Sequence, residues 1–331
     1  MGTQQEDAPD LFGNVGSVEV DPEGRVWVLD DQALEIRVFD REGRYVRTVG
    51  REGGGPGEFR APQAIHRSPD GNMWVPDPRN NRVSIFDTSG TYVEGRYMSG
   101  GFGSTRWPGG FDRLGYYYLP IRIVEDIDGL ALVRFTTAYA VIDTLQVPTD
   151  PKERDVFELR IRDMRATLNV PFAGHFAWRL APSGNFWGML ADEYRLYELS
   201  PRGDTLRTVT REFTRLSVTD AEMEATRVEL EPFIRAGGDV DWSKIPRTKP
   251  AARDFFIDDE GNLWVLPETA EEDAGRLVDV FASDGLFLGA VRLPFEIEMA
   301  PRPLIRNSTL YCVTKDELDV PYVVWAKIVK P

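Results

Sequence analysis

The amino-acid sequence predicts an all-β fold, a six-bladed β-propeller whose blades are four-stranded antiparallel sheets. Three observations support this prediction. A short motif ending in an aromatic residue recurs along the chain, a second hairpin motif follows most of its copies, and the residues between turns alternate as β-strands do. With 331 residues, of which 42% are hydrophobic, the chain is long enough to bury a sizeable core.

In the recurring motif, an aromatic residue follows a turn residue by three positions, as in DPEGRVWVLD at 21–30 and DDEGNLWVLP at 258–267. The turn residue is glycine in five copies and Ser308 in the sixth, weaker copy. Glycine tolerates the positive φ of a tight turn, so each copy predicts the hairpin between the first two strands of a blade. The six aromatic residues are Trp27, Trp74, Tyr118, Trp187, Trp264 and Tyr311.

A second hairpin motif supplies the third and fourth strands, as in IRVFDREGRYVRTV at 36–49 and VDVFASDGLFLGAV at 278–291. Four antiparallel strands per repeat make one propeller blade. A single sheet of this kind cannot bury both of its faces. We therefore expect the blades to pack radially, with Trp and Phe side chains filling the spaces between them.

We expect a single domain over residues 1–331, with insertions at about 148–174 and 213–250, where the motif spacing lengthens. Both insertions connect one blade to the next, which places them on the same face of the propeller. In the second, Thr219 to Glu222 matches a capping box, which predicts a short helix between blades four and five from about 219 to 231, ending near Pro232.

Blade six has three predicted strands of its own, and the last ends at about residue 330. An open sheet edge at this position would invite aggregation. We therefore predict that the N-terminal segment around Ala8 to Gly13 adds the missing strand and closes the ring.

The amino-acid composition disfavours several classes of binding partner. The formal net charge of −15 and the pI of about 4.8 disfavour binding to nucleic acid or to anionic lipid surfaces. The single cysteine, Cys312, excludes a disulfide within the chain, and no apolar run approaches the roughly 20 residues of a membrane-spanning helix. The N-terminus has no signal-peptide pattern. Two interpretations remain open: a cytoplasmic protein, or an exported protein whose leader, with or without a lipid anchor, has been replaced.

Two stretches, GREGGGPGEFRAP at 50–62 and DPRNNRVSIFD at 77–87, resemble the blade connector and the following segment of NHL-repeat proteins. The likeness extends to bacterial six-bladed propeller proteins that are often exported or lipid-anchored. It implies an extracytoplasmic location, whether periplasmic, secreted or surface-anchored, and a role as a binding or assembly surface. Some relatives of the same architecture are metal-dependent lactonases, phosphotriesterases or a zinc lyase.

Alignment of the repeats predicts a polar rim at the mouth of the central channel. Gln63 and Arg253 align at one level of the first strands, His175 precedes that level by one position, and Asp254 follows it. Asp30 and Asp77 end the second strands and are expected at the same rim. Such a ring would accommodate a small ligand, a water cluster or a cation, of which calcium is the candidate. The alternative interpretation is a hydrated set of structural polar residues.

No complete catalytic set is present. The chain has two histidines, whereas a zinc site like that of the lyase would need about three imidazoles, and Gln63 stands where the resemblance calls for a histidine. The early stretch Asn14-Val15-Gly16-Ser17, which aligns with the glutamate-bearing position of calcium-dependent hydrolases, has no glutamate, and no GxSxG motif occurs. We therefore predict no catalytic residue and no cofactor, and leave the metal content open.

The leading hypothesis is a non-enzymatic module that presents its insertion-bearing face to a protein, peptide or glycan partner. The alternative is a divalent-metal-dependent hydrolase of lactones or esters with its site at the channel mouth.

Overall fold

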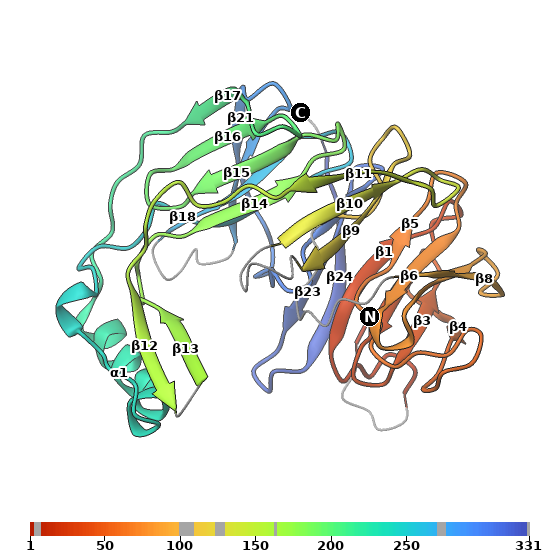
Figure 1. Ribbon diagram of the computed structural model, residues 1–331, viewed down its shortest axis with the longest axis horizontal. Helices are drawn as coiled ribbons and strands as arrows, with labels where there is room; N and C mark the ends of the chain where they lie inside the picture. The colour runs from red at the N-terminus through yellow and green to blue at the C-terminus, as the bar shows by residue number, and fades with distance from the viewer. Residues whose placement is uncertain (3–7, 99–108, 123–129, 162–163, 270–275, 330–331) are drawn as a thin grey trace.

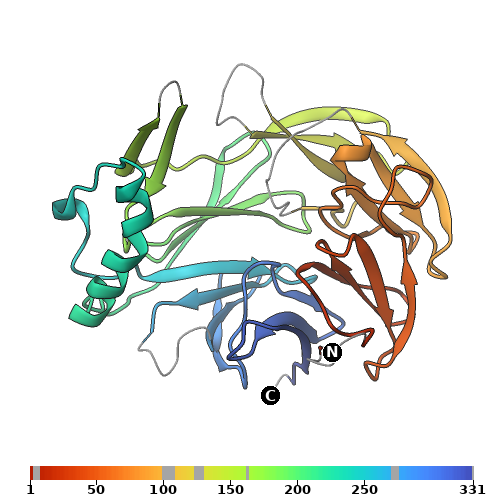
Figure 2. The same ribbon diagram turned by 90° about the horizontal axis from the view of Figure 1, so that it is seen from below.

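The computed structural model describes residues 1–2, 8–98, 109–122, 130–161, 164–269 and 276–329. Six sheets follow one another around a ring, so the chain is a six-bladed β-propeller, as predicted (Figures 1 and 2). The first and sixth blades lie side by side (Figure 2). Strand β1 contacts β22 and β23 there, which closes the ring.

Four blades have the predicted four antiparallel strands in chain order. Blade one comprises β1 (Val15–Val20), β2 (Val26–Asp30), β3 (Glu35–Phe39) and β4 (Tyr45–Val49). Blade two comprises β5 (His66–Arg67), β6 (Met73–Asp77), β7 (Arg82–Phe86) and β8 (Tyr92–Tyr97), with a short 3-10 helix, η1 (Pro78–Asn80), between β6 and β7. Blade four comprises β14 (Phe176–Leu180), β15 (Phe186–Leu190), β16 (Arg195–Leu199) and β17 (Thr205–Thr210). Blade five comprises β18 (Ala252–Ile257), β19 (Leu263–Pro267), β20 (Leu277–Phe281) and β21 (Phe287–Arg292).

Blades three and six have three strands each among the described residues; three were predicted for blade six, whereas four were predicted for blade three. Blade three comprises β9 (Tyr117–Arg122), β10 (Leu130–Phe135) and β11 (Val141–Gln146). Before β9, the described residues from 109 onward form one bridge, between Phe111 and Tyr117. Blade six comprises β22 (Leu304–Arg306), β23 (Thr309–Lys315) and β24 (Pro321–Lys327).

The prediction that Ala8 to Gly13 forms the closing strand is wrong, because this segment is irregular. Its backbone forms hydrogen bonds with side chains instead: the Asp30 carboxylate accepts the Gly13 N–H at 2.8 Å, and Arg37 donates to the Leu11 carbonyl. Its polar groups are thus not presented to the edge of blade six. There, Met1 and Val323 exchange two backbone hydrogen bonds, both of 2.7 Å.

The core is divided among the junctions between blades. Six buried apolar clusters each join residues of two neighbouring blades, and together they go once round the ring. Each of the six motif aromatics belongs to a different junction. In the order of blades one–two, two–three, three–four, four–five, five–six and six–one, they are Trp27, Trp74, Tyr118, Trp187, Trp264 and Tyr311. The prediction that aromatic side chains fill the spaces between blades is therefore confirmed.

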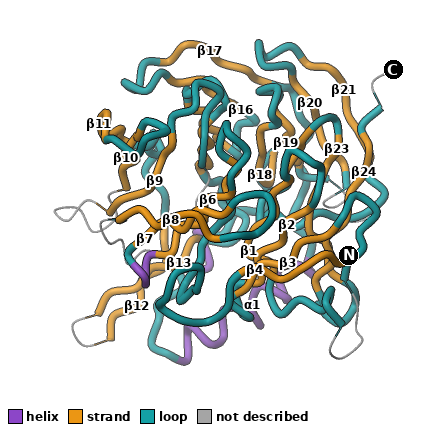
Figure 3. Tube along the Cα trace, turned by 90° about the vertical axis from the view of Figure 1, so that its right-hand side faces the viewer, coloured by secondary structure: helices purple, strands orange, loops and turns teal. Residues whose placement is uncertain are grey.

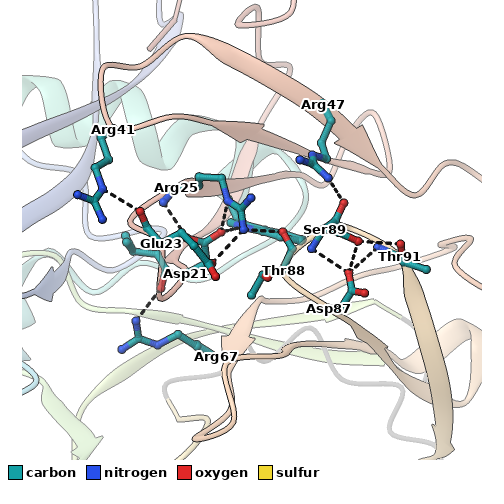
Figure 4. Close-up of polar contacts among 12 residues, drawn as sticks. Asp21, Glu23, Arg25, Arg41, Arg47, Arg67, Asp87, Thr88, Ser89 and Thr91 are labelled. Carbon is teal, nitrogen blue, oxygen red and sulfur yellow. Dashed lines mark hydrogen bonds and ion pairs between the residues drawn. The ribbon is translucent and has the colours of Figure 1, made fainter.

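A repeated arginine contact joins blades at their outer strands. Arg47 on β4 donates to the Ser89 carbonyl in the β7–β8 turn of the next blade, and Arg25 donates to the neighbouring Thr88 carbonyl at 2.6 Å (Figure 4). The same contact recurs from Arg96 to the Thr137 carbonyl and from Arg207 to the Ser283 carbonyl, each at 2.8 Å. These contacts hold hairpin turns of one blade against the strand edge of another.

The two insertions pack together on one side of the propeller, and we call their described residues, within 148–174 and 213–250, the cap. The cap contains the hairpin β12 (Val156–Ile161) and β13 (Met164–Asn169), the helix α1 (Asp220–Arg235) and the 3-10 helix η2 (Trp242–Lys244). Figures 1 and 3 show α1 beside this hairpin, away from most of the strands. They share a core of Phe157, Val170, Met223, Leu230 and Ile245. The sequence-based expectation that the insertions gather on one face is met.

The capping box at the start of α1 is confirmed, but the helix extends past Pro232 to Arg235. Proline removes one helical hydrogen bond, which usually ends or kinks a helix. Here Leu230 is buried in the cap core and Phe233 packs against it, and the Ala236 N–H donates to the Pro232 carbonyl at 3.0 Å. Tertiary packing on both sides of Pro232 therefore sustains the last turn.

Candidate functional site

A pocket of about 300 Å³ lies where the cap meets blades four and five. Its wall comes from the connector after β13, from α1, from the connector before β18 and from the ends of β18 and β19. The lining residues are Phe172, Ala173, His175, Glu222, Lys249, Pro250, Arg253 and Glu268. Two of them, His175 and Arg253, are among the residues that the sequence predicted for a binding site. We call this the cap pocket.

Lys249 is the centre of an ion-pair network in the cap pocket. Its ammonium group pairs with Glu222 and lies 3.7 Å from the Glu268 carboxylate. The hydrogen bond to Glu222 raises the pKa of Lys249, and the same contact lowers the pKa of Glu222. Burial raises the pKa of Glu268 instead. Glu222 also closes the capping box of α1 on Thr219, so one carboxylate both anchors the helix and lines the pocket.

His175 and Arg253 form the other polar part of the cap pocket. Burial lowers the pKa of His175, although the nearby Asp254 carboxylate opposes the shift, so the imidazole is neutral at pH 7. Arg253 is exposed, and no hydrogen bond or ion pair within the described part of the chain holds its guanidinium. The cap pocket thus presents an exposed cation beside a neutral imidazole, the ring of Phe172 and the Glu268 carboxylate, with which Arg253 interacts electrostatically.

Asp254, another residue predicted at the channel rim, forms an ion pair between two blades. The Arg179 guanidinium on β14 pairs with the Asp254 carboxylate on β18 and also donates to the Phe255 carbonyl at 2.9 Å. Arg179 is buried. The pair therefore joins blades four and five at the inner strands, behind the cap pocket.

Gln63 lies in a different cavity, the central channel of the ring, which also has a volume of about 300 Å³. Gly16 lines this channel cavity too. His66 is on its wall, with its Nδ1 atom 3.1 Å from the Tyr117 hydroxyl, and burial lowers its pKa to about 4. The structure therefore divides the predicted rim between two cavities.

Asp30 and Asp77 are fully buried and bind backbone amides instead of lining either cavity. Asp77 accepts the N–H groups of Arg60 and Ala61, each at 2.9 Å, and Asp30 accepts those of Gly13 and Ala33 at 2.8 and 3.0 Å. Each carboxylate fixes the connector that leads into the first strand of its blade. This placement agrees with the alternative interpretation of the predicted ring, in which its members are structural polar residues.

The sequence reasoning missed Lys249, Glu222 and Glu268 as pocket residues. Glu222 was recognised only as part of a helix cap, and the other two lie in connectors without a motif. Their meeting depends on how the cap folds back on blades four and five. The only sequence signal was that an insertion ends immediately before β18.

Among the described residues, no group of three His, Cys, Asp or Glu side chains comes together as a metal site would require. Asp30, Asp77 and Asp254 already bind amides or Arg179. These candidate residues therefore do not come together as the metal ligands that the hydrolase interpretation requires. No helix in the described ranges is long and apolar enough to cross a membrane.

Comparison with known proteins agrees on the fold. Residues 8–67 match the model of the family DUF5128, described as a 6-bladed beta-propeller. No curated protein sequence matches the chain.

Several solved structures share the fold at low sequence identity. Virginiamycin B lyase from Staphylococcus aureus is 11% identical with a TM-score of 0.44, over 94% of this chain and 83% of that one. Regucalcin from Agrobacterium tumefaciens, a calcium-binding protein, is 11% identical with a TM-score of 0.45, over 94% and 86%. A DUF4221 family member from Bacteroides vulgatus is 12% identical with a TM-score of 0.48, over 95% and 93%. The class that fold and comparison define is the six-bladed β-propeller.

Proposed function

We propose that this propeller is a non-enzymatic binding or assembly module that takes a protein, peptide or glycan partner on its cap-bearing face. The observation that supports the proposal is the cap pocket, in which an exposed Arg253 lies beside Phe172 and His175. Binding residues concentrate on loops held by a rigid scaffold, and both insertions that form the cap are such connectors.

The chemistry of the cap pocket favours a partner that combines an acidic group with an apolar one. A guanidinium recognises carboxylates through paired hydrogen bonds, and an aromatic ring contributes apolar contact area. Lys249 is already shared by two carboxylates, so Arg253 is the cation that a partner would meet. We infer that the partner presents a carboxylate next to an apolar surface.

The test compares the wild-type protein with Arg253→Glu on arrays of peptides and glycans. A matched control is Arg202→Glu, which reverses an equally exposed arginine in the β16–β17 turn, outside the cap. We expect the wild type and Arg202→Glu to bind the same array members and Arg253→Glu to lose them. Identical binding profiles for all three proteins, or no binding by the wild type, would contradict the proposal.

The proposal includes an extracytoplasmic location, which the resemblance to exported propellers implies. Fractionation of cells that express the native gene tests it directly. Recovery in the periplasm, the medium or the cell surface is expected, and recovery in the cytoplasm would refute this part.

A further inference from the structure

The channel cavity holds an arginine whose guanidinium forms no hydrogen bond or close ion pair with the described part of the chain. Residues 299–306, which lead into and form β22, run along the cavity wall, and Arg302 lies among them. Burial, and secondarily the neighbouring Arg179, lowers the pKa of Arg302 to about 9, although the Asp254 carboxylate opposes the shift, and the guanidinium stays charged at pH 7. Arg302 is half-buried, and a charge partly withdrawn from water is stabilised by an anion that pairs with it.

The other charged groups in this part of the channel already have partners. Glu19 on β1 and Arg306 on β22 form a two-fold contact, with both distances 3.2 Å. Arg179 pairs with Asp254, and the Asp258 carboxylate accepts the Trp264 indole N–H at 3.0 Å.

His66 adds no charge, because burial keeps its imidazole neutral at pH 7. Arg179 and Arg302 therefore share one carboxylate, Asp254, beside about 300 Å³ of space.

We propose that the channel cavity binds a small organic monocarboxylate whose carboxylate group pairs with Arg302. A guanidinium matches a carboxylate with two parallel hydrogen bonds. Phe111, Ile257 and Met299 line the same cavity and provide apolar surface for the rest of the ligand. This site is separate from the cap pocket and does not depend on the proposed function.

The charge of the surroundings selects a monoanion. Glu19, Asp254 and Asp258 all lie in or next to the cavity, and their carboxylates would repel a second negative charge on a ligand. A phosphate dianion or a dicarboxylate is therefore disfavoured relative to a group with a single charge.

Calorimetric titration with acetate, benzoate and 3-phenylpropionate at pH 7 tests the site, with benzamide as the uncharged counterpart of benzoate. We expect saturable one-to-one binding of benzoate or 3-phenylpropionate, and at least tenfold weaker binding of benzamide. Arg302→Gln should lose at least tenfold in affinity, and Arg302→Lys should lie between it and the wild type. Arg202→Gln, an exposed arginine outside the channel, should bind as the wild type does.

The proposal is overturned if none of the three carboxylates binds, if benzamide binds as tightly as benzoate, or if Arg302→Gln leaves the affinity unchanged. Arg302 forms no hydrogen bond or close ion pair with the residues that the structure describes, so we expect the variant to fold; if it does not, the comparison of benzoate with benzamide on the wild type still decides. Arg253→Glu should retain carboxylate affinity, which separates failure of this site from failure of the cap pocket.

Discussion

At the scale of single residues, an aspartate at the start of a motif turn holds the motif aromatic six positions later. Asp21 accepts the Trp27 indole N–H at 3.0 Å, and Asp112 accepts the Tyr118 hydroxyl at 2.8 Å. The same carboxylates accept backbone N–H groups of their turns. One side chain thus fixes both the hairpin and the aromatic that fills the junction between blades.

The Asp258 carboxylate gives the clearest test, because it accepts the N–H groups of Glu260 and Asn262 as well as the Trp264 indole. Asp258→Ala removes the acceptor of one buried indole N–H and of two partly buried backbone N–H groups, and we expect a loss of about 2–4 kcal/mol in the free energy of unfolding, measured in urea. Asp284→Ala, in an exposed turn of the same blade, should change it by less than about 0.5 kcal/mol. Equal effects of the two substitutions would show that the Asp258 hydrogen bonds do not stabilise the folded state.

His66 provides a prediction on pH. Burial lowers its pKa from 6.5 to about 4, so the folded state favours the neutral ring. The stability that this supplies is present above about pH 6.5 and is lost as the pH falls toward about 4. NMR titration of the ring protons, assigned with a His175→Gln variant, should give a midpoint near 4. A midpoint near the ordinary value would mean that His66 is accessible to water.

At the scale of elements, the cap is a small folded unit that has its own core. The hairpin β12–β13 comes from one insertion and α1 from the other, and their apolar side chains meet in a cluster separate from the six junction clusters. The cap is tied to blade four by the Lys152 and Arg154 side chains, which pair with Asp192 in the β15–β16 turn at 2.5 and 3.0 Å. Its shape therefore depends on contacts between segments distant in sequence.

Leu230→Ala should destabilise the cap without destabilising the ring of blades. Leu230 is buried in the cap core, and truncation of a buried leucine costs about 2–5 kcal/mol. We expect faster hydrogen exchange in α1 and in β12–β13, with unchanged exchange in β14 to β17. Val228→Ala, at an exposed position of the same helix, serves as the control. Equal acceleration in the blades would mean that cap and ring unfold together.

At the scale of the whole molecule, the ring depends on the junction between its first and last blades. Phe12, Val15, Val313 and Val323 pack together across this junction. The buried Glu19 of blade one meets Arg306 of blade six at the channel wall. Burial would raise the pKa of Glu19, but the charge and hydrogen bonds of Arg306 and further contacts outweigh it and hold this pKa below its ordinary value.

Removing Arg306 should weaken ring closure, because it leaves a buried carboxylate without its partner. We expect Arg306→Met to lower the free energy of unfolding by about 3–5 kcal/mol, and the double variant Glu19→Gln with Arg306→Met to recover part of that loss. Urea denaturation of the two single variants and the double variant measures the coupling. Additive effects would show that the pair does not hold the blades together.

The sequence by itself determined the propeller and the number of its blades. Turn glycines, alternating strands and one aromatic per repeat are local features, and local features determine hairpins and the face that each strand buries. The six motif aromatics accordingly occupy six different junctions. The capping box of α1 was visible for the same reason.

Only the tertiary structure decided which polar groups meet. The aligned repeats placed Asp30, Asp77, Gln63 and Arg253 on one rim, but the carboxylates bind connector amides and the other two residues line separate cavities. Arg302 could not be recognised from its position, since a partner for a long charged side chain is chosen by packing across blades. Local pattern determines strands and turns, whereas pairing of charges depends on contacts between distant parts of the chain.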